Sequence, residues 1–194
     1  MIIEPRVLEG AHVRLEPAGE QHRDEMRAVL DQDPGNWEIQ SVSGRGEQFG
    51  DYWRLMTETP RRIAYVVREQ AGGRMAGTSS LFDIDQQHRT CEIGYTWFAP
   101  EYRGTLVNPE AKLLMLGEAF GAGALRVQFS VDARNGRSQA AVLKLGAKKE
   151  GVIRRHKLTW TGHKRDTALF SIIETEWPDV ERGLRARLRQ TPTA

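Results

Sequence analysis

The sequence predicts a mixed α/β (α+β) fold in one domain, and three observations support this class. Segments with the two-residue period of strands alternate with segments that have the 3.6-residue period of helices. The turn at residues 70–74 contains Gly-Gly between two apolar runs, which is typical of an antiparallel hairpin. The 194 residues, 39% of them hydrophobic and 28% charged, are enough for one domain with its own core. We therefore expect a single domain over residues 1–194.

The N-terminal quarter is expected to hold one strand and two helices. Val13–Leu15 alternates apolar residues around a charge, as a short strand does. Residues 21–30 carry apolar side chains at helical spacing, and residues 49–59 predict a second helix before a proline. The intervening residues 31–50 are rich in Gly, Ser, Asp and Asn and predict a long loop. The loop contains Trp37, so it is interpreted either as a binding loop or as a segment that packs on the core.

Sheet signals dominate the middle of the chain, where three antiparallel strands are predicted at residues 63–67, 75–84 and 90–98. A second alternation of strand and helix patterns follows, in which Gly146 is a natural helix stop. The remaining elements are expected in this order: a helix to about residue 122, a strand at 125–131, a helix at 135–145, strands at 150–160 and 165–173, and an amphipathic helix at about 178–190.

The most informative stretch is Arg103–Lys112, which lies between an apolar strand and a helical pattern. Asn108 is a suitable N-cap, and Pro109 suits the first helical position, where a missing N–H is tolerated. A strand, a short turn with a glycine and a helix N-terminus direct unpaired backbone N–H groups at one point. A phosphate group can bind there. The stretch therefore predicts a site for a phosphate-bearing ligand.

Short motifs along the chain carry a family resemblance through their order and spacing. They are Leu8-Glu9-Gly10, Val13-Arg14-Leu15-Glu16-Pro17, Gly77-Thr78-Ser79-Ser80, Glu92-Ile93-Gly94-Tyr95-Thr96-Trp97, Gly104-Thr105 with Asn108, Asn135 with Ser138, Lys144-Leu145-Gly146-Ala147 and Glu150-Gly151. Together they resemble the GNAT family of acetyl-CoA-dependent N-acetyltransferases, and within it the ribosomal-protein N-terminal acetyltransferase branch. The likeness covers about residues 8–177, which is the expected core of the domain.

The resemblance implies the acyl-CoA acyltransferase fold, with a central, mostly antiparallel, twisted sheet flanked by helices. It also implies that acetyl-CoA, as co-substrate, lies between strands that splay near Phe98 and Leu125. The cofactor-binding residues implied in this way are Tyr95, Thr96, Trp97, Phe98, Arg103, Gly104, Thr105, Leu106, Val107, Asn108, Asn135, Arg137 and Ser138. The phosphate loop departs from the family pattern, because Leu106 and Asn108 stand where glycine or alanine is usual. Asn108 either offers its amide to the pyrophosphate or only caps the helix.

Acetyl transfer to an amine requires a base, a polarised carbonyl and a proton for the departing thiolate. Glu92 is the candidate base, since a carboxylate in an apolar strand is costly unless it is paired or functional. Strand alternation predicts that Glu92, Gly94, Thr96 and Phe98 share one face. The structural alternative is a salt bridge from Glu92 to an arginine. A backbone N–H near Tyr95 or Thr96 is expected to hold the carbonyl.

The family's usual acid, a tyrosine, is replaced here by Val142. Ser138 is the nearest polar substitute, as acid or as a hydrogen-bond partner of the cofactor. Arg134, Arg137 and Lys144 are candidates for the 3′-phosphate of CoA, with a solvated helix face as the alternative.

Composition and spacing exclude several other classes. The formal charge of +2 gives no support for nucleic acid, and the single cysteine, Cys91, excludes an internal disulfide. No histidine pair has metal-ligand spacing, so no metal is expected. Without a signal-peptide or membrane-span pattern, the expected location is the cytoplasm, with no membrane partner. A monomer and a homodimer both remain open.

The function predicted from the sequence is transfer of an acetyl group from acetyl-CoA to a primary amine. The acceptor is a small-molecule or peptide amine: a protein N-terminus, an amino acid or a small amine. The alternative is a non-catalytic acyl-CoA-binding module, because the acid and the loop glycines of the family are missing.

Overall fold

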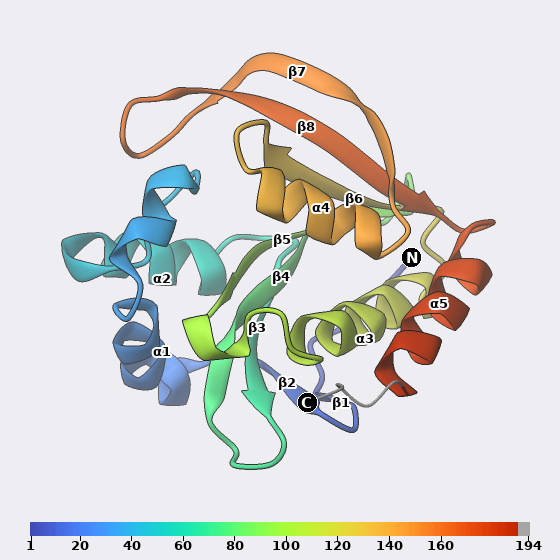
Figure 1. The fold of residues 1–194 in the computed structure, drawn as a ribbon, viewed down its shortest axis with the longest axis horizontal. Coiled ribbons are helices and arrows are strands. Elements are labelled where there is room, and N and C mark those ends of the chain that lie inside the picture. The colour runs from blue at the N-terminus through green and yellow to red at the C-terminus, as the bar shows by residue number, and fades with distance from the viewer. Residues whose placement is uncertain (190–194) are drawn as a thin grey trace.

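The computed structural model describes residues 1–189, and its framework is one eight-stranded sheet with helices on both faces (Figure 1). The strand order is β1-β2-β3-β4-β5-β6-β8-β7. The strands are β1 (Leu8–Glu9), β2 (Val13–Pro17), β3 (Ile63–Glu69), β4 (Met75–Asp85), β5 (Thr90–Phe98), β6 (Arg126–Asp132), β7 (Lys148–Leu158) and β8 (Lys164–Ile173). All neighbours are antiparallel except β5 and β6, which are parallel. The predicted mixed α/β class with a mostly antiparallel sheet is confirmed.

Within residues 1–189 there are five α-helices and four 3₁₀ segments, and all except α5 lie between strands in the chain. They are α1 (Arg23–Leu30), α2 (Phe49–Thr57), α3 (Val107–Gly121), α4 (Gly136–Lys144), α5 (Trp177–Arg189), η1 (Glu20–His22), η2 (Pro34–Ile39), η3 (Gly46–Gln48) and η4 (Pro100–Tyr102). Each predicted helix is present, because each has an apolar face to bury. The loop predicted at residues 31–50 instead contains η2 and η3. Residue 190 of the predicted C-terminal helix lies outside the described residues.

The two faces of the sheet are covered by different helices. On one face, the Tyr52 hydroxyl of α2 lies 3.2 Å from Thr78 Oγ1, and Ser80 Oγ of the same strand lies 3.7 Å from Met56 Sδ. On the other face, Lys112 of α3 donates to Ser79 Oγ. Since Ser79 lies between Thr78 and Ser80 on β4, α2 and α3 pack on opposite faces.

The sheet opens between its two central strands. The parallel strands β5 and β6 pair only through Thr90↔Arg126, Cys91↔Val127 and Glu92↔Gln128. Beyond these residues the strands diverge, and α4 and the start of α3 lie beside the opening (Figure 1). The splayed strands predicted by the family resemblance are therefore present, at the predicted strands.

A bulge in β5 changes which side chains share a face. Ser80 pairs with Gly94 but Thr78 pairs with Trp97, so three steps on β5 oppose two on β4. Tyr95 has a positive φ of 50° at this point. The bulge returns Trp97 to the face of Gly94 and turns Thr96 to the opposite face, where it meets Lys112. The predicted common face of Glu92, Gly94, Thr96 and Phe98 is wrong for this reason.

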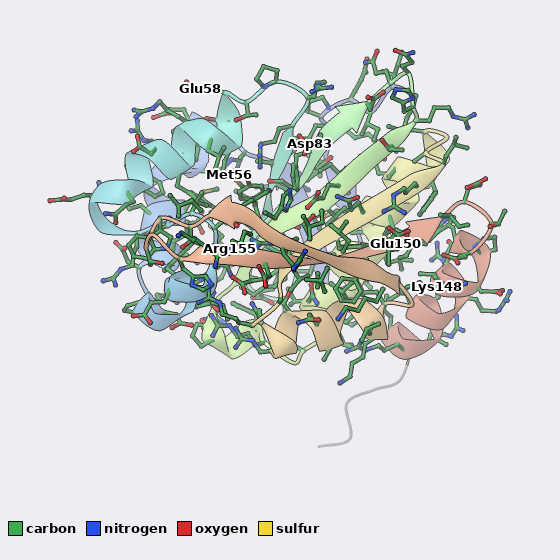
Figure 2. All side chains as sticks on the ribbon, turned by 90° about the horizontal axis from the view of Figure 1, so that it is seen from above. Met56, Glu58, Asp83, Lys148, Glu150 and Arg155 are labelled. Atoms are coloured by element: carbon green, nitrogen blue, oxygen red, sulfur yellow. The ribbon has the colours of Figure 1, made fainter. Side chains whose placement is uncertain are left out.

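The C-terminal hairpin, formed by β7 and β8, continues the sheet beyond β6 and ends it at β7. Figure 2 shows Arg155 midway along β7, with Glu150 and Lys148 toward its start beside α5. The side chains of β7 are exposed along its length, and Glu150 is held by Arg126 and by Ser171 Oγ. No helix within residues 1–189 is long and apolar enough to cross a bilayer.

Candidate active site

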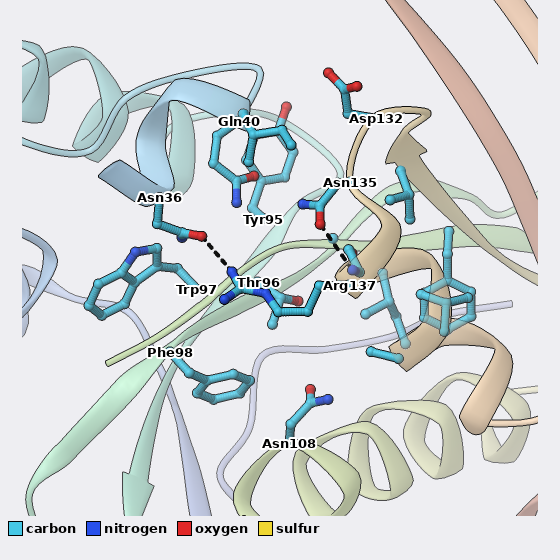
Figure 3. A pocket seen from close by; sticks show the side chains of 18 of the residues that line it. Asn36, Gln40, Tyr95, Thr96, Trp97, Phe98, Asn108, Asp132, Asn135 and Arg137 are labelled. Atoms are coloured by element: carbon cyan, nitrogen blue, oxygen red, sulfur yellow. Dashed lines mark hydrogen bonds between the residues drawn. The ribbon is translucent and has the colours of Figure 1, made fainter. Parts of the chain in front are cut away.

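The divergence of β5 and β6 creates a cleft of about 260 Å³, shown in Figure 3. Most of the predicted cofactor-binding residues line it: Tyr95, Thr96, Trp97, Phe98, Arg103, Gly104, Asn108, Asn135, Arg137 and Ser138. Thr105, Leu106 and Val107 do not line it. Val107 is buried, and Thr105 uses its hydroxyl to bond the carbonyl of Tyr102 at 2.7 Å.

The start of α3 differs from the prediction. The N-cap residue is Leu106, and the hydroxyl of Thr105 accepts a hydrogen bond of 3.3 Å from the Val107 N–H. Asn108 is therefore the second helical residue and makes no cap, which excludes the capping-only role. Its side chain projects from α3 toward the cleft in Figure 3, and its Oδ1 is buried without a partner among the described residues.

The groups at this end of the cleft fit a phosphate. Arg103 donates from Nε to the Phe98 carbonyl at 2.9 Å and pairs through Nη1 with Asp33 at 2.6 Å. Its Nη2 is buried with no partner in the described part of the chain. A buried donor without a partner is costly, and an anion in the cleft would satisfy it. Gly104 has a positive φ of 79°, which lets the loop turn into the helix.

The opposite wall of the cleft is α4. Asn135 caps this helix as predicted, with its Oδ1 accepting from the Ser138 N–H at 3.0 Å. Arg137 reaches across the mouth and donates to Asn36 Oδ1 at 2.8 Å, as Figure 3 shows. Of the other phosphate candidates, Arg134 is paired with Asp132 at 2.9 Å, and Lys144 lies outside the cleft.

A second, smaller cavity of about 70 Å³ adjoins the cleft and contains Glu92. The Glu92 side chain is 7% exposed, and its Oε2 accepts a hydrogen bond of 2.9 Å from Gln128 Nε2. No arginine within the described residues forms a salt bridge with Glu92, so the structural alternative from the sequence is not observed. The cleft and this cavity share seven lining residues: Gln40, Gly94, Tyr95, Thr96, Trp97, Ser130 and Arg165.

The long loop closes both cavities from above. Trp37 is 2% exposed and stacks on Trp97 with ring centroids 6.1 Å apart. Asn36 and Gln40 line the cleft beside it (Figure 3). Trp37 therefore packs on the core, while its neighbours line the cleft, and the binding role of the loop stays a prediction.

Sequence reasoning missed two buried cations of the site. Arg165 is 6% exposed, borders both cavities and donates to Ser130 O and Thr167 Oγ1, each at 3.1 Å. Lys112 is 5% exposed, lines the cleft and donates to Ser79 Oγ at 2.7 Å and Thr96 Oγ1 at 2.6 Å. Burial lowers the pKa of Lys112 to about 7. The sequence offers one indication of a role for Lys112 in the site, because it lies four residues after Asn108 and so on the same helix face.

Other reactive groups do not form a competing centre. Burial raises the pKa of Cys91 to about 12, which keeps its thiol protonated at neutral pH. Within residues 1–189, no three His, Cys, Asp or Glu side chains are grouped as a metal site.

Comparison with known proteins agrees with this fold. A family model described as an acetyltransferase (GNAT) domain matches residues 12–148. YdaF of Bacillus subtilis (strain 168), provisionally named a ribosomal N-acetyltransferase, is 32% identical over 106 residues, which are 54% of this chain and 57% of YdaF. The chain spans less than two thirds of the length of the two curated relatives it matches, 57% and 64%.

Solved structures are similar over nearly the whole chain. A protein from T. thermophilus, provisionally described as an acetyltransferase, is 35% identical with a TM-score of 0.87, covering 97% of this chain and 100% of that one. A GCN5-related N-acetyltransferase from Brucella melitensis is 28% identical with a TM-score of 0.85, covering 97% and 87%. The fold is that of the acetyltransferases to which these structures are assigned. The chain belongs to the GNAT acetyltransferase family.

Proposed function

We propose that this protein transfers the acetyl group of acetyl-CoA to the amine of a protein or peptide N-terminus. The observation that carries the proposal is the meeting of two cavities at the β5 bulge. One is the cleft between β5 and β6 with unpartnered polar groups at its α3 end, and the other holds the carboxylate of Glu92. The two substrates would then enter from opposite sides and meet at Gly94–Trp97.

In this proposal the cleft holds the acetyl-CoA. Arg103 and Asn108, with the N–H groups of the α3 N-terminus, bind the pyrophosphate. Asn135 and Ser138 face the pantetheine arm from α4, and Arg137 borders the mouth. The pairing of β5 with β4 omits Tyr95 and Thr96, and a bulge leaves backbone N–H groups unpaired. The thioester carbonyl therefore lies against the bulge, where such N–H groups can donate to it.

Glu92 is the proposed general base, directly or through one water. The carboxylate accepts a hydrogen bond from Gln128 and forms no salt bridge in the described structure, and in this proposal it takes the proton of the attacking amine. The cavity of about 70 Å³ beside the carboxylate has room for an amine head group.

The acceptor class is supported by YdaF, which is provisionally named a ribosomal N-acetyltransferase. The sequence leaves three acceptors open, a protein N-terminus, an amino acid and a small amine, and all three present the same head group. A thiol-release assay with acetyl-CoA should therefore compare N-terminal peptides, free amino acids and small amines. Turnover confined to free amino acids or small amines would contradict the proposed acceptor.

The second candidate function is a non-catalytic acyl-CoA-binding module. It is favoured by Val142, which is 8% exposed and lines the cleft where the family places its tyrosine acid. Calorimetry with acetyl-CoA distinguishes the two. Binding without thiol release across the whole panel of amines would support the module and contradict the enzyme.

A further inference from the structure

The ammonium of Lys112 is the least expected group in the cleft. Its Nζ donates to Ser79 Oγ and Thr96 Oγ1, and these two hydroxyls lie 2.8 Å from each other. A protonated lysine has three N–H donors, so one remains after these two bonds. Lys112 lines the cleft, and in the described structure no group other than these two hydroxyls accepts a hydrogen bond from its Nζ.

A purely structural role explains this lysine poorly. The neighbouring positions on α3, Ala111, Leu113, Met115 and Leu116, are buried and apolar. An apolar side chain at position 112 would continue this surface without desolvating a charge, which is costly inside a protein. A titratable group held in a cleft by burial is a candidate functional group.

No charged side chain in the described structure is paired with Lys112, so burial determines the direction of its pKa shift. On α3, Glu110 is turned away and accepts three backbone N–H groups from Ala11, His12 and Val13. On β5, Glu92 lies on the opposite face and is bonded to Gln128. The bonded partners of Lys112 are two hydroxyls, Ser79 on β4 and Thr96 on β5. Burial is the cause that lowers its pKa to about 7, a value suited to proton transfer near neutral pH.

The remaining charges at the cleft belong to other pairs. Asp132 on β6 is bonded by Arg134, Arg103 pairs with Asp33, and Arg137 donates to Asn36. Arg165 bonds neutral oxygens across the cleft. None of these side chains bonds Lys112 in the described structure.

Glu92 and Lys112 border the reaction centre from opposite sides. Glu92 lines only the small cavity and Lys112 only the cleft, while Thr96, the partner of Lys112, lines both. The acceptor amine enters beside Glu92, so the thiol departs on the side of Lys112. The α4 position that would otherwise supply an acid is Val142, and an unperturbed serine hydroxyl such as that of Ser138 is a poor proton donor at neutral pH.

We propose that Lys112 is the general acid that protonates the departing thiolate of CoA. This step rests on the proposed acetyl transfer. The amine nitrogen forms a bond to the thioester carbonyl carbon, and Glu92 takes the amine proton. The carbon–sulfur bond then breaks, its electron pair goes to sulfur, and the third N–H of Lys112 delivers the proton that makes the free thiol. Lys112 then takes one proton from solvent and returns to its charged form. Glu92 releases one proton to solvent, so the two transfers balance.

Two variants distinguish proton donation by Lys112 from the effects of its charge and of its packing. Lys112→Arg keeps a cation that does not release its proton at neutral pH, and Lys112→Met keeps the volume without the charge. Lys164→Met, on an exposed lysine of β8 that borders neither cavity, is the matched control. We expect both Lys112 variants to lower kcat about 100-fold or more while the Kd for CoA changes less than about 3-fold. The control should retain wild-type values.

The pH profile supplies the second readout. For the wild type, kcat/KM for acetyl-CoA should fall as pH rises through about 7, because the free enzyme loses the donated proton. This decrease in kcat/KM should be absent from the pH profile of Lys112→Met. The ¹⁵Nζ resonance of Lys112, followed by NMR in the protein without ligand, should titrate near the same pH.

The outcomes are distinct. A kcat of Lys112→Arg equal to that of the wild type would overturn proton donation by Lys112. A pH profile of kcat/KM for the wild type without the expected decrease would also overturn it, and this measurement does not depend on a variant that folds. A resonance that titrates near the ordinary lysine pKa of about 10 would also overturn it. Absence of turnover by the wild type with every amine would instead contradict the acetyltransferase itself, leaving Lys112 without a thiolate to protonate.

Discussion

Glu92 and Lys112 lie on opposite faces of β5, separated by the bulge at Tyr95. Glu92 pairs across the ladder with Phe82 on the α2 face, and Lys112 reaches Ser79 and Thr96 from the α3 face. Without the extra residue of the bulge, Thr96 would share the face of Glu92. The bulge therefore creates two separate polar environments within one strand, and it is the reason that two cavities meet there.

Replacing Glu92 by Gln should lower turnover about 100-fold or more at neutral pH, because the amide cannot accept the amine proton. The amide matches the carboxylate in size, so cofactor binding measured by calorimetry should persist. Unchanged rates across the whole pH range would remove Glu92 from the mechanism.

The substitution Asn108→Asp should weaken acetyl-CoA binding by about 10-fold or more, since it sets a negative charge beside the proposed pyrophosphate position. Gln48→Glu makes the same charge change on an exposed residue of η3 and should leave the Kd unaltered. Equal affinities of wild type and Asn108→Asp in a calorimetric titration would place the phosphates elsewhere.

The substitution Gly104→Ala should cost about 1 kcal/mol of unfolding free energy, because a side chain disfavours the positive φ of 79°. Nothing lies within 4 Å of the added Cβ, so the cost is conformational and not steric. Gly136→Ala, in the first turn of α4 with equally open space, should not lower the melting temperature. Equal stability of the two variants by thermal denaturation would refute this account.

Gly94→Ala tests the packing beneath the bulge. The Cβ would lie 2.9 Å from Phe82 Cε1, so the Phe82 ring must shift, at a cost of about 1–3 kcal/mol. Phe82→Leu in the same chain makes room and should recover part of that loss, giving a non-additive double-mutant cycle. Additive losses in urea unfolding would mean that the two residues are not coupled.

Lys112 should also make stability depend on pH. Its pKa is about 7 in the folded protein and near the ordinary 10.5 when unfolded. Between these values only the unfolded state binds the proton, so the free energy of unfolding rises with pH, by on the order of 1 kcal/mol per unit. Lys112→Met should lack this increment in urea denaturation at pH 7 and pH 9. Parallel pH slopes for the two proteins would contradict the lowered pKa.

The sequence by itself determined the element order, the position of the turn before α3 and the family. Hydrophobic periodicity and turn residues are local properties, so the strand at Thr90–Phe98 and the cap at Asn135 could be predicted without contacts. The family followed from motifs such as Glu92–Trp97 in a fixed order. The location of the cleft between β5 and β6 then followed from the fold that the resemblance implies.

Only the tertiary structure decided which side chains meet. The bulge at Tyr95 depends on the register between β4 and β5, which strand alternation alone does not contain. The burial of Lys112 depends on α3 packing over Ser79 and Thr96, residues that lie 33 and 16 positions away in the chain. A lysine in an amphipathic helix is usually exposed, and its pKa changes only when distant segments exclude water from it.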